Sequence, residues 1–158
     1  MGKGSIIAVV VLIAIVAVVA FIAYPMFMGG ENKAAKLQPD LSAFPDGWKI
    51  DPSETANVTS GKDSNSRQWF RNAGETEHVV VAISYYSTVE KANDSYSSLY
   101  SNHGPGVVFT GSFDRGFSVG KEFYFQKGNV VVQLLASYST LTTAQINTIV
   151  DNILGKIA

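Results

Sequence analysis

The sequence predicts an α+β fold in which an N-terminal transmembrane helix precedes an antiparallel sheet with two packed helices. Three observations lead to this prediction. The chain opens with residues 6–28, a run that has no charged side chain. Further on, several short segments alternate apolar and polar residues with a period of two and are joined by turn residues. The period changes to helical spacing twice, so the predicted order is a β-rich region, a helix, β-strands and a C-terminal helix.

Residues 6–28 are the predicted membrane helix. At ~1.5 Å per residue, a helix of these residues is long enough to cross the ~30 Å hydrocarbon core of a bilayer. A helix also forms all its backbone hydrogen bonds internally, as lipid requires. The domain organisation expected is a short cytoplasmic head at residues 1–5, the transmembrane helix, a polar tether at residues 29–40 and a soluble α+β domain at residues 41–158. Because so short a head has little room for a function, we expect a single-pass protein of the cell membrane with its C-terminal domain outside.

Two other interpretations of the N-terminus are weighed. A cleaved secretory peptide usually has an apolar region of roughly 7–15 residues, and this run is longer. Lys3-Gly4-Ser5 resembles the cleavage site of archaeal type IV pilin-like precursors, which makes Gly4 and Ser5 a candidate leader-processing site. A pilin usually continues its apolar helix into the globular head, whereas Pro25 and the glycines at 29–30 interrupt the helix here.

The first half of the soluble domain reads as strands followed by a helix. A strand can start at Trp48, a short one is expected at residues 56–59, and residues 68–71 and 78–86 form a hairpin. Ser87 and Glu90 have the spacing of a capping box, so the first helix starts there.

The second half repeats this order. Strands are expected at residues 107–112, 122–126 and 130–138, with a tight turn around Gly128 between the last two. The final helix, at residues 142–156, carries one apolar stripe that packs on the sheet, formed by Ile146, Ile149, Val150, Ile153, Leu154 and Ile157.

Composition excludes several classes of function. With no cysteine the chain has neither disulfides nor thiolate chemistry, and a net charge of −1 with mixed signs offers no basic face for nucleic acid. Two histidines without ligand spacing predict no metal site, and no cofactor is expected. The sequons at Asn57 and Asn93 are candidate glycosylation sites if the domain is exported.

No catalytic motif stands out. There is no G-x-S-x-G elbow, and residues 111–116 lack the spacing of a phosphate-binding loop, so they read as a turn. An enzyme would require a cleft that gathers dispersed residues such as His78, Asp114, Arg115 or Glu122. The aromatic content suggests instead that some tyrosines line a groove between sheet and helices that suits a ligand or partner.

Two stretches carry a family resemblance. Phe44-Pro45-Asp46-Gly47-Trp48 resembles the P-x-G-W start of PsbP/Mog1-like domains, and residues 123–132, followed by a terminal helix, are similar to the same group. The resemblance covers residues 41–158 and also extends to exported single-domain proteins that carry a membrane anchor. It implies a non-catalytic α+β domain used in binding or assembly, and it assigns no functional residue.

The function expected from the sequence is therefore that of a membrane-anchored extracytoplasmic domain, not an enzyme, for ligand binding or protein interaction in the cell envelope. Its expected partners are the lipid bilayer, through residues 6–28, and an envelope protein or a small ligand. Two alternatives stay open: a pilin-like filament subunit processed after Gly4, and an accessory subunit of a membrane complex.

Overall fold

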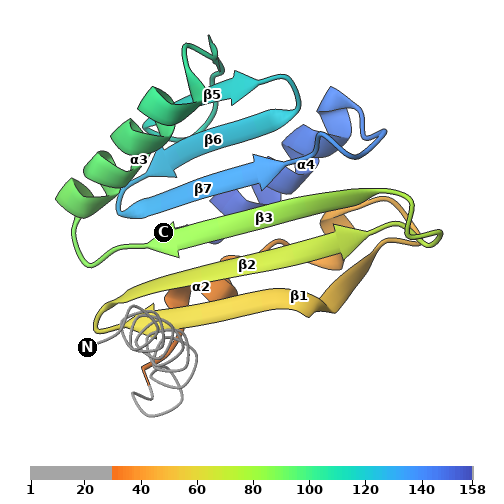
Figure 1. Ribbon diagram of the computed structural model, residues 1–158, viewed down its shortest axis with the longest axis horizontal. Coiled ribbons are helices and arrows are strands. Elements are labelled where there is room, and N and C mark those ends of the chain that lie inside the picture. Colours follow the sequence, from red (N-terminus) through yellow and green to blue (C-terminus); the bar gives the residue numbers. More distant parts are fainter. Residues whose placement is uncertain (1–29, 158) are drawn as a thin grey trace, which may run out of the picture.

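A computed structural model describes residues 30–157, which form one seven-stranded sheet with helices on both faces (Figure 1). Every neighbouring pair of strands is antiparallel, in the order β1-β2-β3-β7-β6-β5-β4. The strands are β1 (Lys49–Ser60), β2 (Asp63–Arg71), β3 (His78–Tyr85), β4 (Val107–Val108), β5 (Arg115–Val119), β6 (Glu122–Lys127) and β7 (Val130–Leu135). The helices are α2 (Lys33–Lys36), the 3-10 turn η1 (Leu41–Ala43), α3 (Val89–His103) and α4 (Thr143–Leu154).

The predicted fold class is α+β with an antiparallel sheet, as observed, but it is wrong in its membrane helix. No helix among residues 30–157 is long and apolar enough to cross a membrane. The longest of them, α3, has 15 residues and is rich in Ser, Asn and charged side chains, as suits a helix with one face in water. Residues 6–28, which the prediction assigned to the span, lie outside the described residues. The described part also holds three α-helices rather than two, because α2 precedes the sheet.

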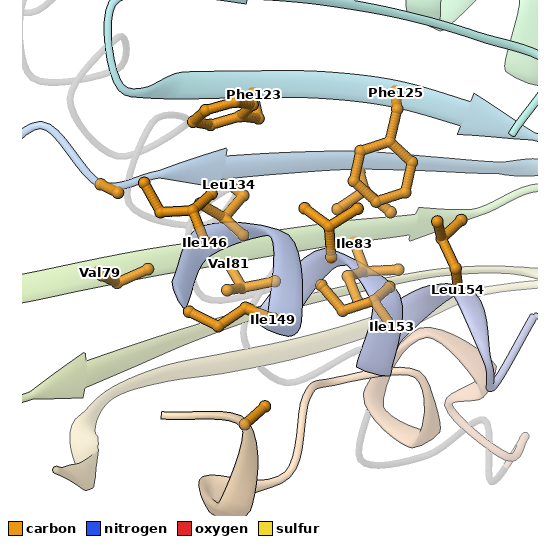
Figure 2. Close-up of a cluster of buried hydrophobic side chains, with 14 of the residues drawn as sticks. Val79, Val81, Ile83, Phe123, Phe125, Leu134, Ile146, Ile149, Ile153 and Leu154 are labelled. Carbon is orange, nitrogen blue, oxygen red and sulfur yellow. The ribbon is translucent and has the colours of Figure 1, made fainter. Parts of the chain in front are cut away.

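The main core lies between the sheet and α4. Figure 2 shows Ile146, Ile149 and Ile153 of α4 next to Val81 and Ile83 of β3. All five are at most 1% exposed, and burying each such side chain stabilises the fold by about 1.5–3 kcal/mol. The predicted stripe of the last helix is therefore confirmed as its buried face.

A smaller core lies on the opposite face, under α3. Ala92 and Tyr96 of α3 pack there with Phe117 of β5, Tyr124 of β6 and Val131 of β7. The helix covers only the β5–β7 half of this face, while the same face of β1, β2 and β3 carries no helix (Figure 1). Its N-cap is Thr88, one residue after the Ser87 that the sequence suggests.

Residues 31–40, predicted as a polar tether, make specific contacts with the domain. Ala34 of α2 is fully buried, and its N–H donates to the Ser64 hydroxyl at 3.1 Å. The Gln38 amide donates to the carbonyl of Val81 at 3.1 Å and to both Ser66 oxygens. This segment therefore covers the sheet beside α4.

Candidate functional site

The candidate site is a pocket at the outer edge of β5, which we call the edge pocket. Strand β4 pairs only with Phe117 and Ser118, so beside Arg115 and Gly116 the sheet has no further strand among the described residues. The chain leaves β4 there and loops out before it returns as β5. The space between this loop, β5 and α3 has a volume of about 490 Å³.

Aromatic rings from α3 and from the loop between β4 and β5 surround the edge pocket. Tyr96 and Tyr100 come from α3, and both contact the ring of Phe117 edge-on, with centroids 5.8 Å and 5.1 Å away. Phe109 and Phe113 come from the loop and lie 4.7 Å apart. The complete lining is Tyr96, Tyr100, Val108, Phe109, Thr110, Gly111, Phe113, Asp114, Arg115 and Gly116.

Two glycines allow the loop to fold closely around its phenylalanines. A Cβ at Gly116 would lie 2.7 Å from the Phe113 ring and 2.8 Å from the Phe109 ring, closer than real Cβ contacts come. A Cβ at Gly111 would also collide with Phe113. The Phe113 ring in turn stacks on Phe125 of the main core, at 5.4 Å, so the loop is tied to the sheet.

Arg115 is the charged group that the fold holds in one orientation at this site. Its Nε donates to the Gln126 Oε1 at 2.8 Å, and its Nη2 donates to the Asn93 Oδ1 at 2.9 Å and to the Asn93 carbonyl at 3.2 Å. The guanidinium carbon lies 4.3 Å from the centre of the Tyr96 ring, a cation–π distance. These contacts connect α3 to β5 and β6 and fix the guanidinium beside the pocket.

Asp114, the acidic residue of the lining, forms its hydrogen bond with a backbone amide and not with Arg115. Its Oδ2 accepts a hydrogen bond from the Gly128 N–H at 2.7 Å, in the turn between β6 and β7. None of the ion pairs among residues 30–157 joins Asp114 to Arg115.

The other residues singled out as potential catalytic groups lie elsewhere. His78 lies in a row of rings on the face of β1–β3 that carries no helix, between Trp69 at 4.8 Å and Tyr138 at 4.9 Å. Burial, and secondarily the nearby Arg71, lower the pKa of His78. Glu122 accepts a hydrogen bond from the Tyr124 hydroxyl at 2.8 Å. The edge pocket therefore gathers Asp114 and Arg115 but neither His78 nor Glu122.

The second histidine and the candidate modification sites are also placed by the structure. His103 is exposed at the end of α3 and contacts Tyr124, with its Nδ1 3.3 Å from the hydroxyl. Asn57 is exposed on β1, while the exposed Asn93 uses its Oδ1 to hold Arg115 and Gln126. Gly4 and Ser5 lie outside the described residues. Within the described part of the chain no cluster of His, Asp or Glu has the geometry of a metal site.

Neither the family models, nor the curated proteins, nor the solved structures compared with this chain include a match. The resemblance to PsbP/Mog1-like domains therefore stays a prediction.

The sequence points to part of this site only. The expected groove lined by tyrosines is found, with Tyr96 and Tyr100 on its helix side. In the sequence, residues 111–116 read as a plain turn, and Arg115 stands out only as one of several dispersed groups that an enzyme would have to gather. The sequence signal for the close folding of this loop is the pair Gly111 and Gly116 around Phe113, since glycines that flank an aromatic residue allow close backbone approach.

Proposed function

We propose that this protein is a non-catalytic binding domain and that the edge pocket holds a small ligand. The observation that supports this function is a cavity of about 490 Å³ lined by four aromatic rings, with one charged donor fixed at its side. Ligand sites in proteins are typically clefts of roughly 300–1,000 Å³ with mostly apolar walls and a few placed polar groups.

The walls of the edge pocket are attached to well-packed elements. Tyr96 is 6% exposed and packs on Phe117, which is fully buried. On the loop side, the Phe109 ring contacts Phe123 and Phe125 of β6 edge-on. A site whose walls are preorganised in this way loses less conformational entropy on binding, which supports a binding role.

Two neighbouring valines allow a matched test. Val108 lines the edge pocket and Val107 does not, yet their exposed fractions are 74% and 73%. We expect Val108→Trp to fill the mouth of the pocket and weaken the binding of aromatic fragments by about tenfold, or about 1.4 kcal/mol. Val107→Trp adds the same side chain outside the pocket, so it should leave the affinity within about twofold.

The measurement is an NMR titration of ¹⁵N-labelled protein with a small library of aromatic acids, amides and amines. Shift changes should concentrate at residues 108–116 and in the part of α3 near Tyr100. A library without binders at these residues, or equal losses in the two valine variants, would contradict ligand binding at the edge pocket.

The same valines favour a second candidate function, protein interaction. They form β4, the outermost strand, and an exposed apolar edge strand is a surface to which another chain can add a strand. A protein partner on this edge would be displaced by both valine substitutions, whereas the edge-pocket ligand responds to Val108→Trp alone.

The subcellular localisation of the protein stays a prediction. The expectation of an extracytoplasmic domain in the cell envelope rests on residues 1–29, outside the described residues. The alternatives of a pilin-like subunit and of an accessory subunit of a membrane complex likewise stay predictions, separable by N-terminal sequencing of the mature chain and by co-purification in mild detergent.

A further inference from the structure

The guanidinium of Arg115 is a half-buried cation whose protein partners are all neutral. Its three hydrogen bonds go to the side-chain oxygens of Gln126 and Asn93 and to one carbonyl. Among residues 30–157 no acceptor bonds its Nη1, and no carboxylate lies within ion-pair distance. Holding a charge partly out of water is costly unless an opposite charge compensates it.

Arg71, on the face of β1–β3 that carries no helix, is arranged differently. It is also partly buried, but its Nε donates to the Asp51 carboxylate at 2.6 Å, so the fold supplies its counter-charge. At Arg115 the nearest acid in sequence, Asp114, is bonded to the Gly128 amide instead. The charge at the edge pocket therefore remains available to an anion.

Apart from Asp114 and Thr110, the rest of the pocket wall is mostly apolar. Tyr100, which is 42% exposed, presents its ring on the helix side, and Phe109 and Phe113 lie on the loop side. A ligand that uses both regions needs a flat apolar body and an anionic group at one end. A planar carboxylate also matches the geometry of a guanidinium, and such charge-assisted hydrogen bonds are roughly twice as strong as neutral ones.

The geometry points to an aromatic or similarly flat carboxylate as the ligand class of the edge pocket, with the carboxylate on Arg115 and the body between Tyr100 and the two phenylalanines. This inference rests on the proposed ligand-binding function and adds the sign and position of the ligand's charge.

Three probes that share one ring system test the charge directly: 2-naphthoate, 2-naphthamide and 2-naphthylmethylamine. Each is titrated into the full chain at pH 7 and 50 mM NaCl, with NMR shifts of residues 108–116 as the readout. We expect naphthoate to bind at least about tenfold more tightly than the amide, because charge-assisted hydrogen bonds are roughly twice as strong as neutral ones. The amine should bind most weakly.

A pair of variants separates charge from structure. Arg115→Gln should remove the preference for naphthoate while naphthamide binding changes by less than about twofold. Asn93→Ala removes a hydrogen-bond partner of Arg115 but keeps its charge, so most of the preference should survive. If Arg115→Gln fails to fold, raising NaCl from 50 to 500 mM in the unaltered protein gives the same information. Salt screens the ion pair between the naphthoate carboxylate and the Arg115 guanidinium, whereas it leaves the affinity for naphthamide unchanged.

The failures of the two proposals are distinguishable. If all three probes bind at residues 108–116 with equal affinity, or if salt has no effect on naphthoate, the anionic ligand class is wrong and the binding pocket stands. If no probe shifts these residues, the proposed function itself fails together with the ligand class.

Discussion

Gln126 shows how a single polar residue can organise the site from within the sheet. It is 1% exposed, yet each of its amide atoms has a partner: Oε1 accepts from Arg115, and Nε2 donates to the Asn93 side chain and the Gly128 carbonyl, both at 2.9 Å. Burying an amide costs little free energy when all its hydrogen bonds are made in this way. Removing the amide leaves its former partners without a hydrogen bond.

At the residue scale this predicts that Gln126→Leu is destabilising although leucine is apolar and similar in size. The change removes the acceptor of the Arg115 Nε and the Gln126 donor to the Gly128 carbonyl and the Asn93 Oδ1. We expect the free energy of unfolding to fall by about 1–3 kcal/mol. Urea unfolding followed by circular dichroism measures it. The matched control is Gln133→Leu, at a half-exposed position of β7, which should change stability by less than about 0.5 kcal/mol. Equal effects of the two substitutions would contradict the role given to Gln126.

Arg115 and Gln126 also mark what residue-level patterns cannot show. The sequence places them on different predicted segments, and nothing in its spacing says that they lie opposite each other. Their pairing follows from the register of β5 on β6, in which Arg115 faces Gln126. A register depends on the whole sheet, so the partner of Arg115 was not predictable.

At the scale of elements, prediction works where one period dominates. The last helix was expected at residues 142–156 and spans Thr143–Leu154, because its stripe is continuous and its cap is strong. Strand β5 was missed, since Arg115-Gly116-Phe117 combines a charge, a glycine and one buried ring instead of an alternating pattern. The segment from Lys49 to Ser60, expected as two pieces, is one strand with an irregularity between Asp51 and Ala56.

The cap of α4 gives a prediction at this scale. The Thr142 hydroxyl accepts from the Gln145 N–H at 3.3 Å, and the Gln145 Oε1 accepts from the Thr142 N–H at 2.9 Å. Thr142→Ala breaks this capping box, and we expect a loss of about 1 kcal/mol because α4 covers the main core. Thr143→Ala, in the first turn of the same helix, has no such bond to lose and serves as the control. Thermal unfolding of both variants decides the point, and a Thr142→Ala protein as stable as the control would refute the cap's contribution.

At the scale of the whole molecule, the α+β class and the antiparallel sheet were predictable from period and turn chemistry, but the extent of the folded unit was not. Residues 31–40 read as a tether because they are mostly polar. In the structure Gln38 is 8% exposed, and its amide donates hydrogen bonds to backbone carbonyls of two strands inside the domain. A polar residue that bonds buried backbone looks in the sequence like one that faces water.

The boundary of the folded unit can therefore be tested by comparing chains that begin at Gly30 and at Leu41. The shorter chain loses the buried Ala34, the apolar contact of Leu37 and the hydrogen bond from Gln38 to the Val81 carbonyl. Removing them uncovers part of the main core and leaves that buried carbonyl without its side-chain donor, so we expect the free energy of unfolding to fall by at least about 2 kcal/mol. Gln38→Ala in the longer chain should reproduce the hydrogen-bond share of this loss, about 1–2 kcal/mol. Urea titrations of the three proteins provide the comparison. Equal midpoints for the two chains would show that residues 30–40 contribute nothing to the fold and that the domain begins at Leu41, where the sequence alone places it.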